Sequence, residues 1–226
     1  MDEPLVVASR IGRDFPDGNA GRIAVLGDVD CTVASGARIA LIGPSGSGKT
    51  TLLHILGGLD RPTSGLIEWP GLGRFEELRP RQIGFVFQSP SLFPALTAVQ
   101  NVGLPMMLAG ERGSADETAA SLLAAFGLAE LTDKLPEELS GGQAQRIAMV
   151  RALAIGPKLV LADEPTGQLD SVTAQLFFDT LLARLEGTGI ALVVATHDED
   201  IAARMATRWK MDHGRLNLQS RWGLEA

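Results

Sequence analysis

The chain has 226 residues, of which 45% are hydrophobic and 21% charged, and its formal net charge is −7. These values predict an ordinary globular protein with a sizeable buried core, and the acidic balance argues against nucleic acid as a main partner. The single cysteine, Cys31, excludes an internal disulfide and favours a reducing compartment; we interpret it as a small buried apolar residue.

No targeting or membrane-spanning segment is expected. The first ten residues, MDEPLVVASR, carry two acids and no long apolar run, which is unlike a signal peptide. The longest apolar runs, such as IALVVA at 190–195, have the length of a strand, well below the roughly 18 residues of a membrane span. We therefore expect a soluble chain, and any membrane-spanning part would belong to another protein.

Apolar strands and helices alternate along much of the sequence. The first 35 residues and the segment around 65–69 are β-like and rich in turns. Apolar runs predict buried strands at 37–43, 82–88, 158–165 and 189–198, and helical spacing predicts helices at 49–59, 171–187 and 199–206. Buried strands with intervening helices predict an α/β fold on a mostly parallel sheet that is covered on both faces.

Between residues 92 and 157 the pattern changes. Three stretches have helical spacing, and no convincing strand interrupts them. We interpret 92–157 as a helical subdomain inserted into an α/β core made by 1–91 and 158–226, so that 1–226 forms a single domain with an N-terminal antiparallel β subdomain.

The segment GPSGSGKT at 43–50 fits the pattern G-x-x-x-x-G-K-[ST] at every position, between a predicted strand and a predicted helix. Its glycines let the backbone approach a phosphate, and its N–H groups form a nest at the positive end of a helix. The alternative is a glycine turn with a chance lysine. We assign the β- and γ-phosphates to Lys49, Mg²⁺ to the Thr50 hydroxyl, and further nucleotide contacts to Gly43, Pro44, Ser45, Gly46, Ser47, Gly48 and Thr51.

Polar groups follow three predicted strands. Asp163 ends the strand LVLAD and is placed to hold Mg²⁺, and the adjacent Glu164 can act as general base on the attacking water. Gln88 follows GFVF and can touch both the metal and the water without adding charge, and His197 follows LVVAT and could hydrogen-bond the γ-phosphate. The alternatives are a strand that ends in solvated acids and a structural histidine, as we expect for His54 and His213.

A second glycine-containing helix start lies at 139–143, LSGGQ. Ser140 can cap the helix while the amides of Gly141 and Gly142 stay open to an anion. By itself this segment would be read as a capped helix start and nothing more.

In this order, GPSGSGKT, the glutamine of VFQS, LSGGQAQR, LVLADEPTGQLD and VVATHD make the chain resemble an ABC-type ATPase subunit over nearly its whole length. The resemblance implies a P-loop NTPase (RecA-like) core, with ATP and Mg²⁺ as cofactors. It also implies a head-to-tail dimer in which the signature of one copy closes over the ATP held by the other. Ser140, Gly142 and Gln143 would then contact the partner's nucleotide, and Asp170 would link the two sites.

The resemblance places Phe15 where the family has an aromatic residue that stacks on adenine, which needs only a ring face; a buried Phe15 without a ligand is the alternative. Ala144 and Gln168 depart from the family's usual glutamine and asparagine. Neither change removes a group assigned to chemistry.

The stretch 85–110 is similar to the lipoprotein-release and macrolide-export branch, although Gln100 replaces the usual glutamate. That branch implies an integral membrane permease with a large extracytoplasmic domain, served at the cytoplasmic face of the inner membrane. A groove around 89–110 would grip a cytoplasmic helix of the permease, unless its apolar residues pack inside the helical subdomain. Those residues are Leu92, Phe93, Leu104 and Met107.

Two other classes stay open. A nucleic-acid ABC ATPase usually carries a long coiled-coil or zinc-bearing insertion, whereas the interval between phosphate loop and signature is compact here and holds no cysteine cluster. A regulatory subunit without hydrolysis is disfavoured by the intact Lys49, Asp163, Glu164 and His197. The molecule that is moved cannot be read from the sequence.

Overall fold

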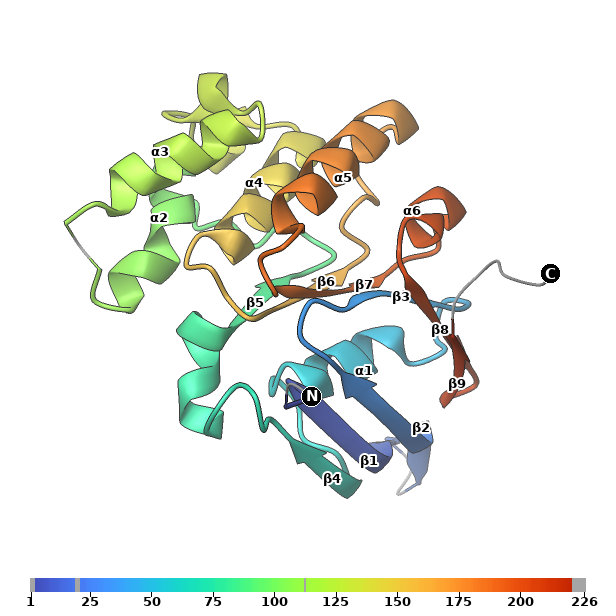
Figure 1. Ribbon diagram of the computed structural model, residues 1–226. Helices are drawn as coiled ribbons and strands as arrows, with labels where there is room; N and C mark the ends of the chain where they lie inside the picture. The colour runs from blue at the N-terminus through green and yellow to red at the C-terminus, as the bar shows by residue number, and fades with distance from the viewer. Residues whose placement is uncertain (1–2, 19–20, 112, 221–226) are drawn as a thin grey trace. The chain divides into compact units, whose positions relative to one another are not determined.

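The computed structural model describes residues 3–18, 21–111 and 113–220 (Figure 1). The chain forms two compact units: one holds the described residues up to Leu78 and from Ala191 onward, and the other spans Arg79–Ile190. Each unit is a group of residues that pack closely with one another. The sequence pattern predicts a different division, in which 92–157 is inserted into an α/β core, and that division stays a prediction.

An antiparallel sheet lies at the start of the first unit. It consists of β1 (Val6–Pro16), β2 (Arg22–Val33) and β4 (Ser64–Glu68), with β1 in the middle (Figure 1). Both neighbours of β1 run antiparallel to it, and the β1–β2 register extends from the pair Val6 and Val33 to the pair Phe15 and Ile23. The predicted N-terminal antiparallel β subdomain is confirmed.

The same unit contains parallel strands. β3 (Arg38–Ile42) pairs in parallel with β7 (Ala191–Ala195) and with β8 (Thr207–Asp212). Every residue of β7 is buried, as expected of a strand covered on both faces. The described residues of this unit also form the helices α1 (Lys49–Leu56) and α6 (Glu199–Ala203) and a short 3₁₀ turn at Phe75–Glu77.

A hairpin that the sequence analysis did not predict follows α6. β9 (Arg215–Ser220) runs antiparallel to β8, and the turn between them holds His213 and Gly214 at φ 44° and 76°. Charged residues alternate along β8 with the buried Trp209 and Met211. This is the period-two pattern of a strand with one face in the core. It is less conspicuous than the continuous apolar runs that predicted the other strands.

In the described part of the second unit, a parallel strand pair is accompanied by the helices α2 to α5. β5 (Ile83–Val86) pairs with β6 (Leu159–Asp163). α2 packs against α3 and α4, and α4 packs against β5. The parallel strands and the helix-rich segment confirm the α/β fold class. The remaining bounds in this unit are α2 (Ala98–Leu108), α3 (Ala115–Ala125), α4 (Gly141–Leu153) and α5 (Ser171–Leu185), with 3₁₀ turns at Ala129–Leu131 and Pro136–Glu138.

A close backbone approach and a buried amide shape the second unit around β5 and α2. A Cβ atom at Gly84 would collide with the carbonyl oxygen of Ala152, so β5 and α4 approach more closely than any other residue at position 84 would allow. Asn101 is fully buried; its amide donates to the carbonyls of Leu96 and Phe93 at 2.9 and 3.2 Å, which fixes the loop before α2. Among the residues that the structure describes, no helix has the length and apolar character needed to cross a bilayer.

Candidate functional site

The phosphate loop runs from Gly43 to Gly48 between β3 and α1, as the sequence predicts. Gly43 has φ 151°, and a Cβ atom there would collide with the carbonyl oxygen of Met211. Gly48 precedes the helix at φ 103°, where a Cβ would lie 2.7 Å from Leu26 Cδ2. Both positions therefore need glycine, because the backbone is left-handed and crowded. The loop residues between them, Pro44, Ser45 and Gly46, are exposed.

Lys49 begins α1 and is 8% exposed. Its Nζ donates to the carbonyl oxygens of Gly43 and Pro44, at 2.8 and 3.1 Å. The ammonium group is therefore held within the loop rather than extended into solvent. The first turn of α1 contains no acidic residue, so nothing there offsets the positive end of the helix. Thr50 and Thr51 follow in the same turn.

The turn of the β8–β9 hairpin is joined to the phosphate loop by a backbone hydrogen bond. The Gly214 amide donates to the Ser47 carbonyl at 3.1 Å, and the Gly214 carbonyl accepts from the Gly27 amide at 2.9 Å. The loop is thus fastened to both the hairpin and β2, which keeps its N–H groups in place without a ligand.

His197 lies at the same sheet edge as the phosphate loop. β3 and β7 are parallel, with Leu41 opposite Ala195, and the Thr196 amide donates to the Leu41 carbonyl at 3.1 Å. The chain leaves β7 at Thr196, and the next residue, His197, is exposed. The carboxyl edge of parallel strands is where such folds bind ligands. His197 and the loop therefore belong to one face of this unit.

Phe15 occupies the penultimate position of β1, and its side chain is 36% exposed. It is therefore not the buried core residue that the sequence left open as an alternative. One face of the ring is covered by Arg13, whose guanidinium carbon lies 4.3 Å from the ring centroid.

The second unit brings together Gln88, Asp163 and Glu164 in the same manner. β5 and β6 are parallel, with Val86 opposite Ala162. Gln88 follows β5 by two residues, Asp163 is the last residue of β6, and Glu164 comes next. All three therefore lie at the carboxyl edge of this strand pair.

The environments of the two acids differ. Asp163 is 3% exposed, whereas Glu164 is half-buried. Glu164 has φ 45°, which is uncommon for any residue other than glycine. Such backbone strain is often found at functional sites, where the surrounding structure maintains it.

The signature segment forms a capped helix start. Ser140 precedes α4, and its hydroxyl accepts from the Gln143 amide at 3.2 Å. The Gln143 side-chain oxygen accepts in return from the Ser140 amide at 2.9 Å. This reciprocal capping box leaves the Ser140 side chain at the head of the helix.

A hollow of about 340 Å³ opens beside that helix start. Arg146 contributes the positive charge among its lining residues, and Gln168 and Leu169 come from the loop before α5. The sequence analysis gave none of these three residues a role, although the spacing of four between Gly142 and Arg146 places both on one helix face. The full lining is Ser140, Gly141, Gly142, Gln143, Arg146, Gln168, Leu169, Asp170 and Thr173.

Asp170 caps α5. Its carboxylate accepts from the Thr173 amide at 2.9 Å. Hydrogen bonding by Thr173 lowers the pKa of the Asp170 carboxyl below its usual value. The residue that the sequence analysis assigned to an interface is therefore an ionised helix cap on the rim of the hollow.

A second hollow of similar volume lies beside β5, and its lining is mostly apolar. Phe93 lines it and is 54% exposed; Pro105 and Leu108 of α2 line it as well. Arg151 closes part of it, and its guanidinium donates to Ser91 O and Ser91 Oγ at 2.7 and 3.0 Å. This hollow coincides in part with the groove expected around 89–110: of the four apolar residues named for that groove, Phe93 lines the hollow, and Leu92, Leu104 and Met107 are not among its lining residues. We call it the α2 groove.

The comparisons with known proteins agree with these motifs. Residues 26–167 match the family model described as ABC transporter. The chain is 45% identical to the lipoprotein-releasing system ATP-binding protein LolD of Legionella pneumophila (strain Paris), over 91% of this chain and 93% of that protein. It is 42% identical to the LolD protein of Ruegeria pomeroyi, over 97% and 100%.

Solved structures show the same fold. A dimeric ATP-binding cassette in a post-hydrolysis state, bound to ADP and Pi, superposes with a TM-score of 0.88 at 34% identity, over 97% of this chain and 100% of that one. A second dimeric structure of the same cassette, described as a bacterial ABC transporter cassette, gives the same values. The chain belongs to the ABC transporter family, as one of its ATP-binding and ATP-hydrolysing subunits.

Proposed function

We propose that this chain powers a membrane permease of the lipoprotein-releasing type, at the cytoplasmic face of the inner membrane. The observation that carries the proposal is its likeness to the LolD proteins, which extends over 91% of the chain rather than over the ATPase motifs alone. The branch pattern at 85–110 and the exposed α2 groove support the same assignment.

The proposed nucleotide contacts follow from the chemistry of each group. Loop amides and Lys49 bind the phosphates, and Phe15 stacks on the adenine. Mg²⁺, when bound, neutralises phosphate charge. Thr50, Gln88 and Asp163 supply hydroxyl, amide and carboxylate oxygens, which are the hard donors that this ion prefers.

Glu164 acts as the general base in this proposal. Its carboxylate takes a proton from the attacking water, so that hydroxide character develops at the water oxygen. Gln88 orients the water, and His197 donates a hydrogen bond to the γ-phosphate. The positive φ at Glu164 supports the assignment, because backbone strain of this kind is concentrated at functional sites.

The signature hollow serves the nucleotide of a second copy. Ser140, Gly141, Gly142 and Gln143 present a helix start to its γ-phosphate and ribose, and Asp170 links the two sites across the interface. Arg146 places a positive charge and Asp170 a negative charge in the lining of the same hollow. ATP bound by both copies closes the dimer, and loss of the γ-phosphate opens it.

The α2 groove receives a short cytoplasmic helix of the permease. Its apolar lining and the exposure of Phe93 suit the apolar face of such a helix. Asn101 fixes the loop that carries Phe93, so the groove is preformed on that side.

Co-purification tests the proposal. The tagged chain is isolated from detergent-solubilised membranes, and the proteins bound to it are identified. The expected partner is an integral membrane protein with a large extracytoplasmic domain. Phe93→Asp should lose this partner and keep ATP binding, whereas Leu66→Asp, a change at a similarly exposed position on β4 that pairs with Ser9, should keep both.

Depletion of the protein in cells distinguishes the lipoprotein-releasing branch from the export branch. Lipoproteins should then accumulate in the inner membrane. If lipoprotein sorting stays normal while sensitivity to macrolides or peptides rises, the export branch replaces the lipoprotein-releasing one. DNA-stimulated ATP hydrolysis without any membrane partner would contradict both.

A further inference from the structure

We propose that Arg13 is a positioning residue for adenine, which holds one face of the Phe15 ring so that the opposite face receives the base. The inference rests on the proposed function, in which Phe15 stacks on the adenine of ATP. It adds a second residue, without contact to the nucleotide, that sets the affinity for the base.

The first observation is the stacking of Arg13 on Phe15. The guanidinium carbon lies 4.3 Å from the ring centroid, within the range of a cation–π contact. The two residues are two positions apart on β1, and the contact itself shows that their side chains meet, although the pairing with β2 shifts its register between Arg13 and Asp14. Since a ring has two faces and Arg13 covers one, an aromatic ligand can stack only on the other.

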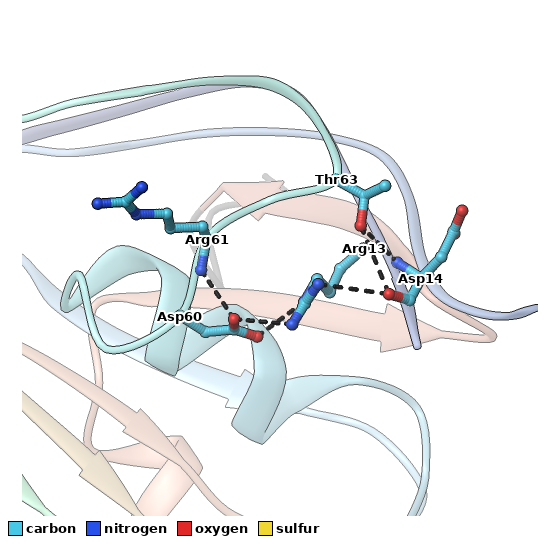
Figure 2. Close-up of polar contacts among 5 residues, drawn as sticks. All are labelled: Arg13, Asp14, Asp60, Arg61 and Thr63. Carbon is cyan, nitrogen blue, oxygen red and sulfur yellow. Dashed lines mark hydrogen bonds and ion pairs between the residues drawn. The ribbon is translucent and has the colours of Figure 1, made fainter. Parts of the chain in front are cut away.

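The second observation is that Arg13 is itself fixed. Its Nε and Nη2 donate to the two carboxylate oxygens of Asp60 at 2.8 and 2.9 Å, which is a bidentate pair (Figure 2). A further bond joins Nη1 to the Asp14 carbonyl at 3.3 Å. Both partners of the ion pair are about three-quarters buried, with side chains 23% and 24% exposed. Such a fork holds the guanidinium in one plane, which a freely rotating side chain could not do.

The third observation is where Asp60 lies. It follows α1 closely, and its backbone amide donates to the carbonyl of His54 in that helix at 3.2 Å. α1 begins at the phosphate loop and ends at Leu56, so Asp60, the anchor of Arg13, lies just beyond the same helix and is hydrogen-bonded to it. Thr63 adds a second contact to β1, because its hydroxyl accepts from the Asp14 amide at 3.0 Å (Figure 2). The ring that stacks on the base is therefore connected, through Arg13, Asp60 and α1, to the loop that binds the phosphates.

These contacts predict a specific energetic role. A half-exposed ring at the end of a strand loses rotational freedom when a base stacks on it, and this loss weakens binding. Arg13 restricts the ring beforehand, so less freedom is lost when the base binds. From the usual strength of an exposed cation–π contact, removal of Arg13 should weaken ATP binding by about two- to fivefold.

Calorimetric titration tests this role with two ligands, MgATP and inorganic tripolyphosphate with Mg²⁺, which lacks the base. Arg13→Ala should weaken MgATP binding and leave tripolyphosphate binding unchanged. In a Phe15→Ala background, Arg13→Ala should have no further effect on MgATP, because no ring is left to position. Arg13→Lys keeps the charge but loses the planar fork, and should resemble Arg13→Ala.

Arg61→Ala is the matched control. Arg61 follows Asp60 in the chain, and its guanidinium carbon lies 5.9 Å from the centroid of a different ring, that of Phe75. This variant should change neither titration. Equal losses for both ligands, or a loss that persists without Phe15, would assign Arg13 to general stability or charge and overturn the inference. If Phe15→Ala weakens MgATP and Arg13→Ala does not, this inference fails and the proposed function stands. If Phe15→Ala has no effect on MgATP, the proposed stacking fails and the inference with it.

Discussion

The side-chain amide of Gln145 donates to the backbone carbonyl of Phe87 at 3.0 Å. Gln145 lies in α4, directly beyond the signature segment, and its side chain is 1% exposed. Phe87 immediately precedes Gln88, which the proposed function assigns to the water and the metal. This bond therefore connects the signature helix with the segment that carries Gln88, within one compact unit.

Gln145→Met should destabilise the protein. Methionine fills a similar volume but cannot donate, so the part-buried hydrogen bond to the Phe87 carbonyl is lost. Loss of a hydrogen bond of this kind costs about 0.5–1.5 kcal/mol in the free energy of unfolding. Urea unfolding followed by circular dichroism measures the change, and an unaltered midpoint would mean that the bond contributes nothing.

Gly84→Ala should lower the stability of the protein, although it adds only one methyl group. The added Cβ would collide with the carbonyl oxygen of Ala152, which is rigid helix backbone. Overpacking of this kind costs about 1–3 kcal/mol in the free energy of unfolding. Gly113→Ala is the matched control in the same unit, because a Cβ there would meet nothing within 4 Å. Equal thermal midpoints for the two variants would contradict the close packing of β5 on α4.

The two signature glycines should differ in their tolerance of alanine. A Cβ at Gly142 would lie 2.9 Å from the Gln168 carbonyl oxygen, whereas at Gly141 it would meet only the end of the Gln168 side chain, which can move. Gly142→Ala should therefore lower steady-state ATP turnover by about tenfold or more, and Gly141→Ala much less. Neither variant should alter ATP affinity at the phosphate loop. Equal ATP turnover in the two variants would show that the signature hollow does not contribute to catalysis.

Glu164→Gln should keep ATP binding and abolish the proton transfer to Glu164. Loss of a general base lowers the hydrolysis rate by about 10²–10⁴-fold, so ATP-bound dimers should accumulate. Size-exclusion chromatography with ATP and Mg²⁺ measures this accumulation. Glu186→Gln, at the exposed end of α5, is the control and should hydrolyse normally. If the Glu164→Gln protein stays monomeric, the proposed role of this carboxylate is wrong.

Cys31 should resist thiol reagents in the folded protein. Burial, followed by the nearby charge of Asp30, raises the pKa of the thiol from its ordinary value of 9.0 to about 12. The folded state thus favours the neutral thiol, so the free energy of unfolding should fall as pH rises from about 9 to about 12. At pH 8, labelling by a disulfide reagent should be roughly 100-fold faster in denaturant than in buffer. Fast labelling in buffer would place Cys31 at the surface.

The α/β strands could be predicted because each is a continuous apolar run. Residues 37–43, 82–88, 158–165 and 189–198 contain β3, β5, β6 and β7, with one to three residues trimmed at each end. Their ends could also be placed, and with them the polar groups at the carboxyl edges. The β8–β9 hairpin was missed because the charges along β8 interrupt its apolar pattern.

Contacts between distant side chains could not be predicted from one sequence. The pairs Arg13 with Asp60 and Gln145 with Phe87 are separated by 47 and 58 residues. No local pattern marks either pair, since each depends on how strands and helices are brought together. The role of the signature segment toward a second copy was taken from resemblance and stays a prediction for Ser140, Gly142 and Gln143.

The support that Gly214 gives to Ser47 has a consequence for the synthesis of the protein. The phosphate loop leaves the ribosome long before the hairpin that backs it, roughly ten seconds or more at ordinary elongation rates. During that interval β1, β2 and α1 can already assemble, but the loop lacks the bond to Gly214. In a nascent chain, the phosphate loop therefore gains the hydrogen bond from Gly214 only after the hairpin has emerged. A chain that terminates before β8 contains the phosphate loop but lacks this bond.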